Sequence, residues 1–280
     1  MQALDEFINQ VKTLPPAPRI FTQLICLLGE DDVDSASIVE LIVFDPALTA
    51  KILHRCNQAA RGLGQPIHSL PEAVMHLGFN EIYRCVAAVF GESMLCKAQL
   101  GYGIAAGELW RHSATAAIGA RCVARSLSLD ENLTFTAALL HDIGKLVLSS
   151  FLEGTYTTLM RETCQAGHSF MEAEKAILGV EHAEVGGRVL ARWNLPENLV
   201  RAVWHHHDPA LAEPHAQLAA AVYLGDMIAH VLGQGHGHQA FAVRGRAEAL
   251  DILQLAPAQI DNLVLETELA LRHSNWFTLP

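Results

Sequence analysis

The sequence has no basic run, and its acidic residues outnumber its basic ones. It holds 30 Asp and Glu against 19 Lys and Arg, a formal net charge of −11 over 280 residues. A protein that grips a phosphate backbone needs clustered positive charge. The charge balance therefore argues against nucleic acid as a partner.

Long apolar runs are also missing, although hydrophobic residues make up 51% of the chain. Charged residues or histidines interrupt each apolar stretch well before the roughly 18 residues that a membrane-spanning helix requires. We therefore expect no membrane partner, and a large hydrophobic core instead. A disordered chain is excluded because only 18% of the residues are charged.

The six cysteines form no Cys-x-x-Cys pair, and no signal peptide precedes them. They are scattered at positions 26, 56, 85, 96, 122 and 164. The chain begins MQALDEFINQVK, which is acidic and amphipathic rather than basic and then apolar. Such thiols are typical of reduced cysteines in a cytosolic protein, so we expect a cytoplasmic location.

Signals for β-strands are sparse, and aromatic residues are only 6% of the chain. Alanine and leucine dominate, and apolar residues recur at spacings of three and four, which indicates helices. Helix starts are predicted at Asp45-Pro46, at the capping box from Ser69 to Glu72, and at Asn194 to Glu197. The sequence predicts an all-α protein of roughly a dozen helices, given typical helix and loop lengths.

Two glycines, Gly101 and Gly103, interrupt the helical pattern. We interpret this point as the boundary between an N-terminal helical subdomain, residues 1–100, and a helical bundle with a C-terminal helical extension, residues 101–280. A second glycine-rich stretch, Gly233 to His238, predicts a surface loop.

Histidine is unusually frequent, with 15 residues. The strongest chemical signal is the doublet His141-Asp142, which lies inside the apolar segment from Leu139 to Lys145. Burying an imidazole beside a carboxylate is costly unless something compensates. A divalent cation compensates well, because nitrogen and oxygen ligands both suit such a metal. A buried His–Asp hydrogen bond is the alternative.

Further candidates follow in apolar helical sequence. Taken singly, each is better interpreted as a satisfied core or surface residue than as a ligand. Together they form an ordered set that could surround one or two cations inside a helical bundle. The further candidates are His112, His182, the triplet His205 to His207, and Asp226.

The order of these residues resembles that of the HD superfamily of metal-dependent phosphohydrolases. More narrowly, residues 10–230 resemble the HDOD domain, the HD-related output domain of bacterial signalling proteins. The resemblance rests on Leu14 to Pro18, Asp45 to Leu48 with Leu53 and Asn57, Ile67 to Leu70 with Ala73, Leu77-Gly78, Leu109-Trp110, His112-Ser113, Ala138 to Lys145, His182 to Gly186 and Trp193 to Pro196.

The resemblance implies an HD-type helical bundle and a metal site. The basic HD metal set would be His112, His141, Asp142 and Asp226. The residues that add a second metal in the related HD-GYP phosphodiesterases would be His182, His206 and His207, since the following Asp208-Pro209 favours this register over His205-His206. The implied cofactor is one or two divalent ions of Fe, Mn, Zn or Mg.

One departure weakens the case for cyclic-dinucleotide hydrolysis. The GYP tripeptide that follows the paired histidines in the HD-GYP enzymes is absent, and residues 208–214 read DPALAEP. HDOD domains are regarded as regulatory. The sequence therefore favours a bacterial signal-transduction module of the response-regulator type, which binds metal and acts through contacts with signalling proteins. The alternative is an active metal-dependent phosphohydrolase acting on a nucleotide or cyclic dinucleotide, which would bind a nucleotide ligand.

Other residues have two interpretations. Lys145 is the catalytic candidate because it could neutralise a phosphate, but we prefer a solvated lysine near a helix end. Arg111 has the same two interpretations, with the surface role preferred. A Cys164/His168 nucleophile lacks an orienting motif. Expected core or cap residues are His54, His68 and His76, and His236 and His238 are expected in a polar loop.

Overall fold

The alanine- and leucine-rich segments form helices throughout the part of the chain that the structure describes. The structure is a computed structural model. It describes residues 46–59, 66–155, 170–235 and 247–274, together with 22–25, 39, 42 and 158. Within these residues there are 11 α-helices, two short 3₁₀ helices and no strand, apart from one isolated bridge between Gln99 and Ile104. The all-α prediction is confirmed.

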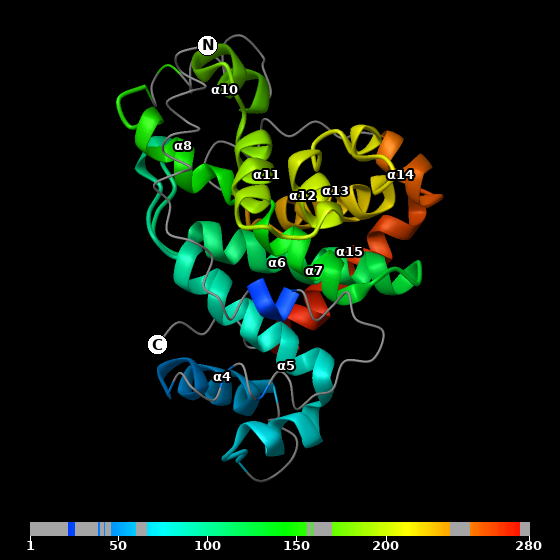
Figure 1. The fold of residues 1–280 in the computed structure, drawn as a ribbon. Helices are drawn as coiled ribbons and strands as arrows, with labels where there is room; N and C mark the ends of the chain where they lie inside the picture. The colour runs from blue at the N-terminus through cyan, green and yellow to red at the C-terminus, as the bar shows by residue number, and fades with distance from the viewer. Residues whose placement is uncertain are drawn as a thin grey trace.

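Figure 1 shows how the described helices are arranged. The first half contains α4 (Pro46–Ala59), α5 (Leu70–Leu95), the 3₁₀ helix η1 (Leu100–Tyr102), α6 (Glu108–Ser126), α7 (Glu131–Leu140) and α8 (Gly144–Leu152). The second half contains α10 (Phe170–Leu178), α11 (His182–Arg192), α12 (Glu197–Trp204), η2 (Pro209–Ala212), α13 (Ala216–Val231), α14 (Ala247–Leu253) and α15 (Ala258–Ser274).

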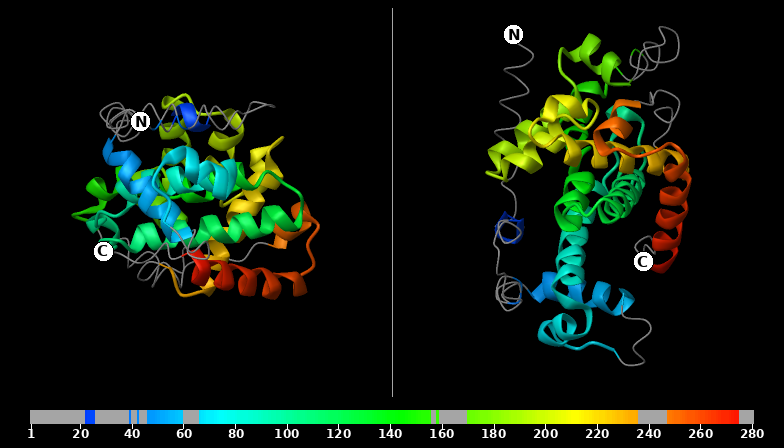
Figure 2. Two further views of the ribbon diagram at one scale, coloured as in Figure 1. Left: turned by 90° about the horizontal axis from the view of Figure 1, so that it is seen from below. Right: turned by 90° about the vertical axis from the view of Figure 1, so that its right-hand side faces the viewer.

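Helices α6, α7 and α13 form the centre of the bundle. Helix α6 packs against both α7 and α13, α11 packs against α12 and α8, and α15 lies along α6. The long helix α5 leaves this centre, and α4 crosses its far end (Figures 1 and 2). The apolar core is continuous across the predicted boundary near residue 100, because Tyr83 of α5 and Phe135 of α7 belong to one cluster. The division into two subdomains stays a prediction.

The predicted helix starts arise from interactions between residues that are close in sequence. Ser69 is the N-cap of α5, and its hydroxyl accepts from the backbone N–H of Glu72. The Glu72 carboxylate reaches back to the N–H of His68, one residue before the N-cap that a standard capping box would engage. Helix α12 begins at Glu197, directly after Pro196 as predicted.

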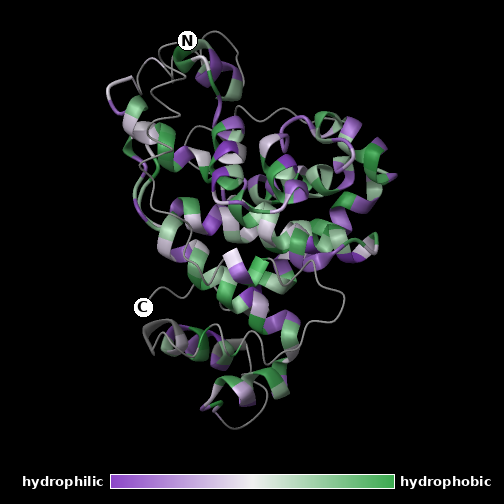
Figure 3. Cartoon of the chain, viewed as in Figure 1, coloured by the Kyte–Doolittle hydropathy of each residue, from purple (hydrophilic) through white to green (hydrophobic). Residues whose placement is uncertain are grey.

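Helix α5 is kinked at Gly78, whose φ of 76° falls in the left-handed region that glycine tolerates. Along the helices, hydrophobic and hydrophilic residues alternate as amphipathic packing requires (Figure 3). Trp110 and Trp193 are buried. Trp204 is partly buried beneath the Arg188 guanidinium.

One described stretch, residues 131–152, is long and apolar enough to cross a membrane by length and composition. It comprises α7 and α8, and 83% of its most apolar window is buried inside the bundle. A turn at residues 141–143 divides it into two helices. The stretch is therefore accounted for as the core of the bundle.

Glycines let the central helices approach closely. A Cβ added to Gly225 of α13 would lie 2.4 Å from the carbonyl oxygen of Ala116 and 2.7 Å from Cβ of Ala120, both on α6. A Cβ added to Gly144 would lie 1.9 Å from the carbonyl oxygen of His182. These contacts bring α13 onto α6, and the start of α8 onto α11, with no room for a side chain.

We expect Gly225→Ala to destabilise the protein, because its methyl group meets backbone atoms that cannot move aside. The expected loss in free energy of unfolding is about 1–3 kcal/mol, measured by chemical denaturation. Gly154→Ala is the control, since an added Cβ there finds no atom within 4 Å. An equal effect of the two substitutions would contradict the close-packing argument.

Candidate metal centre

The seven residues predicted as ligands come from five different places in the chain and meet in one buried cluster. His112 lies on α6, His182 is the first residue of α11, and Asp226 lies on α13. The doublet His141-Asp142 occupies the turn between α7 and α8, and His206-His207 the turn after α12. Six of the seven are 0–3% exposed, and His207 is half-buried.

The doublet was predicted within a continuous helical segment, and this detail is wrong. Helix α7 ends at Leu140, and α8 begins at Gly144. The backbone between them makes i to i+3 hydrogen bonds, including Ile143 N–H to the Leu140 carbonyl. This tight turn places both polar side chains of the doublet toward the cluster.

A chain of neighbouring imidazole rings runs through the cluster. The ring centroids of His112 and His141 are 5.2 Å apart, and those of His141 and His206 are 5.0 Å apart. His206 lies 4.0 Å from His207, which lies 4.9 Å from His182. The structure therefore brings all five predicted histidines together.

Four of these histidines direct Nδ1 at an oxygen acceptor. A backbone carbonyl only accepts, so Nδ1 carries the hydrogen in the three rings that face one, and Glu174 favours the same tautomer of His182 when its carboxyl group is ionised. In the neutral imidazole, Nε2 then has a bare lone pair. The pairs are His112 with the Gln234 carbonyl (3.0 Å), His141 with the Ala138 carbonyl (2.7 Å), His206 with the Val203 carbonyl (2.7 Å) and His182 with Oε2 of Glu174 (2.7 Å).

The Nε2 atoms of the cluster approach one another closely. The Nε2 atoms of His112 and His141 are 3.3 Å apart, and those of His182 and His207 are 2.9 Å apart. Nε2 of His206 is buried and makes no hydrogen bond within the described chain. Lone pairs this close repel unless a proton or a cation lies between them. The donor set therefore fits a metal ion.

Two carboxylates complete the cluster. Oδ1 of Asp226 is 3.1 Å from Nε2 of His112 and 3.8 Å from Nε2 of His141. Asp142 reaches both halves, because its Oδ2 is 3.4 Å from Nε2 of His141 and its Oδ1 is 3.3 Å from Nε2 of His182. Asp142 thus connects the group around His141 with the group around His182.

Three sets of side chains each offer ligand atoms that all lie within 4.8 Å of one another. Nitrogen and oxygen donors of this kind suit Zn, Fe and Mn, whereas Mg favours oxygen alone. Because the sets share residues, they have room for one ion or for two adjacent ions. The sets are His112, His141 and Asp226; His141, Asp142 and His206; and His182, His206 and His207.

Burial keeps the cluster in the protonation state that a metal needs. It lowers the pKa of His206 to about 4 and also lowers the pKa values of His141, His182 and His207. Burial by itself would raise the pKa of Asp226, but the charge of His230 and hydrogen bonds to it hold that pKa well below its usual value. Neutral imidazoles therefore stand beside an ionised carboxylate.

Lys145 is not the solvated lysine that we preferred. It is 5% exposed, and its Nζ lies 2.6 Å from Oδ2 of Asp142. The turn before Gly144 brings Lys145 back over the doublet, three residues after Asp142. A buried ammonium needs a counter-charge, and this carboxylate supplies it. The catalytic role of Lys145 stays a prediction.

Two site residues were missed. His230 lies one turn after Asp226 on α13, and its Nε2 is 3.3 Å from Oδ1 of that residue. The i, i+4 spacing of Asp226 and His230 was the available signal. The buried Glu174 accepts from the N–H of His182 (2.8 Å) and from the hydroxyl of Tyr102 (2.7 Å). The sequence analysis found no signal for Glu174.

Burial raises the pKa of Glu174 to about 7, although the surrounding donors oppose this shift. The carboxylate fixes the ring of His182 through Nδ1, which is how outer partners commonly orient a metal-binding histidine.

The remaining candidates stay apart from the cluster. His205 stacks on Trp204 and is half-buried, which agrees with the choice of His206-His207. His54, His68 and His76 are exposed, so none of them is a core residue, and His68 lies at the start of α5, where its backbone N–H donates to Glu72. Arg111 is half-buried. The Cys164/His168 pair, His236 and His238 lie outside the described residues.

Known proteins resemble this chain over most of its length. A crystal structure of an HDOD domain protein of unknown function from Geobacter sulfurreducens has a TM-score of 0.80 and 23% identity, covering 99% of this chain and 98% of that one. A structure from Shewanella amazonensis SB2B, provisionally described as a phosphohydrolase, has a TM-score of 0.73 and 20% identity, covering 96% and 95%. At such identities these similarities show the fold alone.

A curated protein from Treponema pallidum (strain Nichols), whose function is uncharacterised, is 23% identical over 223 residues. The match covers 78% of this chain but only 42% of that relative, so the chain spans about two fifths of its length. The HDOD domain matches residues 14–209, well over half of the 280 residues. The match includes every predicted ligand except Asp226, and the chain therefore belongs to the HDOD family.

Proposed function

We propose that this chain is a metal-binding regulatory module of bacterial signal transduction. Its buried histidines and aspartates hold one or two divalent ions, and a signalling protein recognises the resulting arrangement of helices. The convergence of bare Nε2 atoms on two carboxylates carries this proposal. Ligands come from α6, from α13, from the start of α11 and from the turns after α7 and α12. An ion bound to them would therefore link the helices at the centre of the bundle.

The chain's own groups prepare the site without the ion. Carbonyls of Ala138 and Val203 hold two imidazoles in the tautomer that leaves Nε2 free. Glu174 orients His182 in the same way. A divalent ion would supply the positive charge that buried carboxylates and facing lone pairs lack, and it would activate a water molecule if one reached it.

A metal-dependent phosphohydrolase acting on a nucleotide or cyclic dinucleotide is the second candidate. The full ligand set and the buried Lys145 favour it, as does the provisional description of the Shewanella protein. Two observations count against it. The GYP tripeptide is absent, and six of the seven ligand residues are at most 3% exposed, which leaves a phosphodiester little access. The partners of the module, signalling proteins or a nucleotide, stay predictions.

We expect the purified protein to contain a stoichiometric divalent ion, measured by elemental analysis. The double variant His141→Ala, Asp142→Ala should lose it, because both halves of the cluster depend on these side chains. His205→Ala is the matched control from the histidine triplet, and it should retain the ion. Wild-type protein that stays metal-free after incubation with Fe, Mn, Zn and Mg, yet is correctly folded, would contradict the proposal.

Metal retention should persist to lower pH than at an exposed histidine site. A site built from histidines with an ordinary pKa of about 6.5 loses its neutral ligands around that pH. Here burial lowers the pKa of His206 to about 4. The neutral form therefore extends downward in pH, so the ion should remain at pH 6 and be released as the pH falls toward 4. Equilibrium dialysis at stepped pH measures this, and half-release near pH 6.5 would contradict the buried-ligand account.

The metal-loaded protein should not turn over phosphodiesters, including linear and cyclic dinucleotides, because the ligands are enclosed. Product formation is followed by chromatography, with the His141→Ala, Asp142→Ala variant as the blank. Turnover that requires the ion and disappears in this variant would favour the phosphohydrolase. In that case, Lys145→Met tests whether the buried ammonium assists the reaction.

A further inference from the structure

Helix α13 has a second apolar face that does not take part in the cluster. Leu224 and Ile228 each lie two residues from Asp226, so they point about 160° away from it around the helix axis. Both are almost fully buried, with 4% and 2% exposure. Helix α13, which carries the predicted ligand Asp226, therefore also forms one wall of a pocket on its opposite side.

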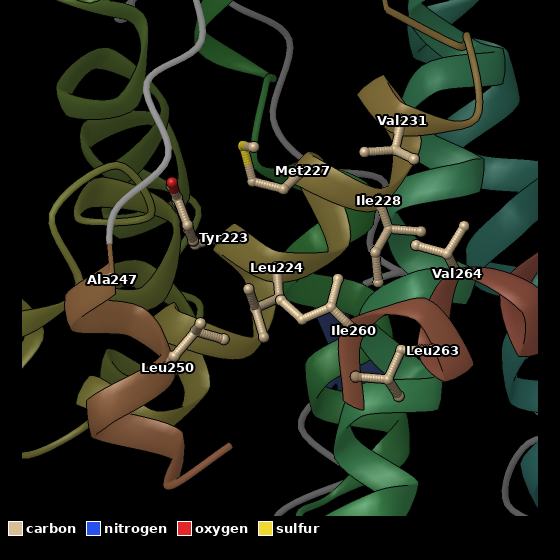
Figure 4. A pocket seen from close by; sticks show the side chains of 10 residues that line it. All are labelled: Tyr223, Leu224, Met227, Ile228, Val231, Ala247, Leu250, Ile260, Leu263 and Val264. Atoms are coloured by element: carbon tan, nitrogen blue, oxygen red, sulfur yellow. The ribbon is translucent and has the colours of Figure 1, made fainter. Parts of the chain in front are cut away.

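That wall borders an apolar pocket of about 220 Å³ between α13, α14 and α15 (Figure 4). Side chains from all three helices converge on it, and Leu250 of α14 points toward Leu224. The lining contains no charged residue. It consists of Tyr223, Leu224, Met227, Ile228, Val231, Ala247, Leu250, Ile260, Leu263 and Val264.

Close packing elsewhere keeps the pocket from closing. Gly225 presses α13 against the backbone of α6, so α13 cannot shift toward α15 without losing that contact. Ile228 also packs over Gly119 of α6, where an added Cβ would lie 3.3 Å from its side chain. Helix α15 packs on α6 as well. Helices α13 and α15, two of the three walls, are thus fixed to the same support.

The chemistry of the lining selects the occupant. An apolar cavity of about 150 Å³ is known to stay dry and to take up benzene. A pocket of about 220 Å³ accommodates one aromatic ring with a small substituent, or a branched alkyl group of that size. An anion is disfavoured, because no basic side chain lines the pocket to compensate its charge.

We propose that this pocket binds a compact, uncharged apolar ligand about the size of one substituted aromatic ring. The pocket residues, 223–264, lie beyond residues 14–209 that the HDOD domain matches. The ligand site is therefore a property of the C-terminal part of this chain, and it does not rest on the proposed metal function.

The test uses the full chain with toluene and indole as uncharged probes and benzoate as the anionic one. Saturation-transfer NMR and the unfolding temperature report binding. Toluene and indole should show saturation transfer and raise the unfolding temperature, and benzoate should do neither. Val264→Phe fills the pocket and should weaken toluene binding at least tenfold.

The matched control is Leu265→Phe, the next residue on α15, whose side chain is 55% exposed and lies outside the pocket. This variant should bind toluene like the wild type. Leu250→Phe fills the pocket from α14 and replaces Val264→Phe in the test if that variant does not fold. Absence of probe binding to the wild type, or binding that neither filling variant weakens, would overturn the ligand site.

Discussion

The carboxylate of Asp142 lies between two groups of buried histidines, and the packing around it depends on how its charge is compensated. It contacts His141 on one side and His182 on the other, with Lys145 at 2.6 Å. An uncompensated carboxylate at this depth would cost several kcal/mol. The lysine offsets part of this cost. It does nothing for the facing Nε2 atoms, and a cation at their centre would relieve that second imbalance.

The backbone at the centre of the bundle is arranged so that these polar groups meet. The chain turns sharply at residues 141–143 where a continuous helix would have been more regular. Gly144 then allows α8 to approach the start of α11. Gly225 brings α13 against α6, which places Asp226 beside His112. Close approaches of the helices therefore occur at the points where the polar groups meet.

The histidine set could be predicted because its members are polar residues embedded in apolar helical sequence, where burial without compensation is costly. Helix starts such as Ser69 could be predicted because capping is a local interaction. The position of Lys145 could not, since it depends on a turn that only tertiary packing produces. Glu174 contacts His182 by a fold-level approach of α10 to α11, which no local pattern encodes.

Burial of the ligands bears on the choice between regulation and catalysis. A hydrolase must bring a phosphodiester oxygen within bonding distance of the ion, so at least one coordination position has to face the substrate. Of the seven predicted ligands, His207 alone is more than 3% exposed. Catalysis would therefore require the turn after α12 or its neighbours to open. A regulatory module would need an opening only wide enough for the ion, and gain or loss of the ion would change the packing of α6, α11 and α13. A partner can recognise that change on the outer surfaces of the same helices.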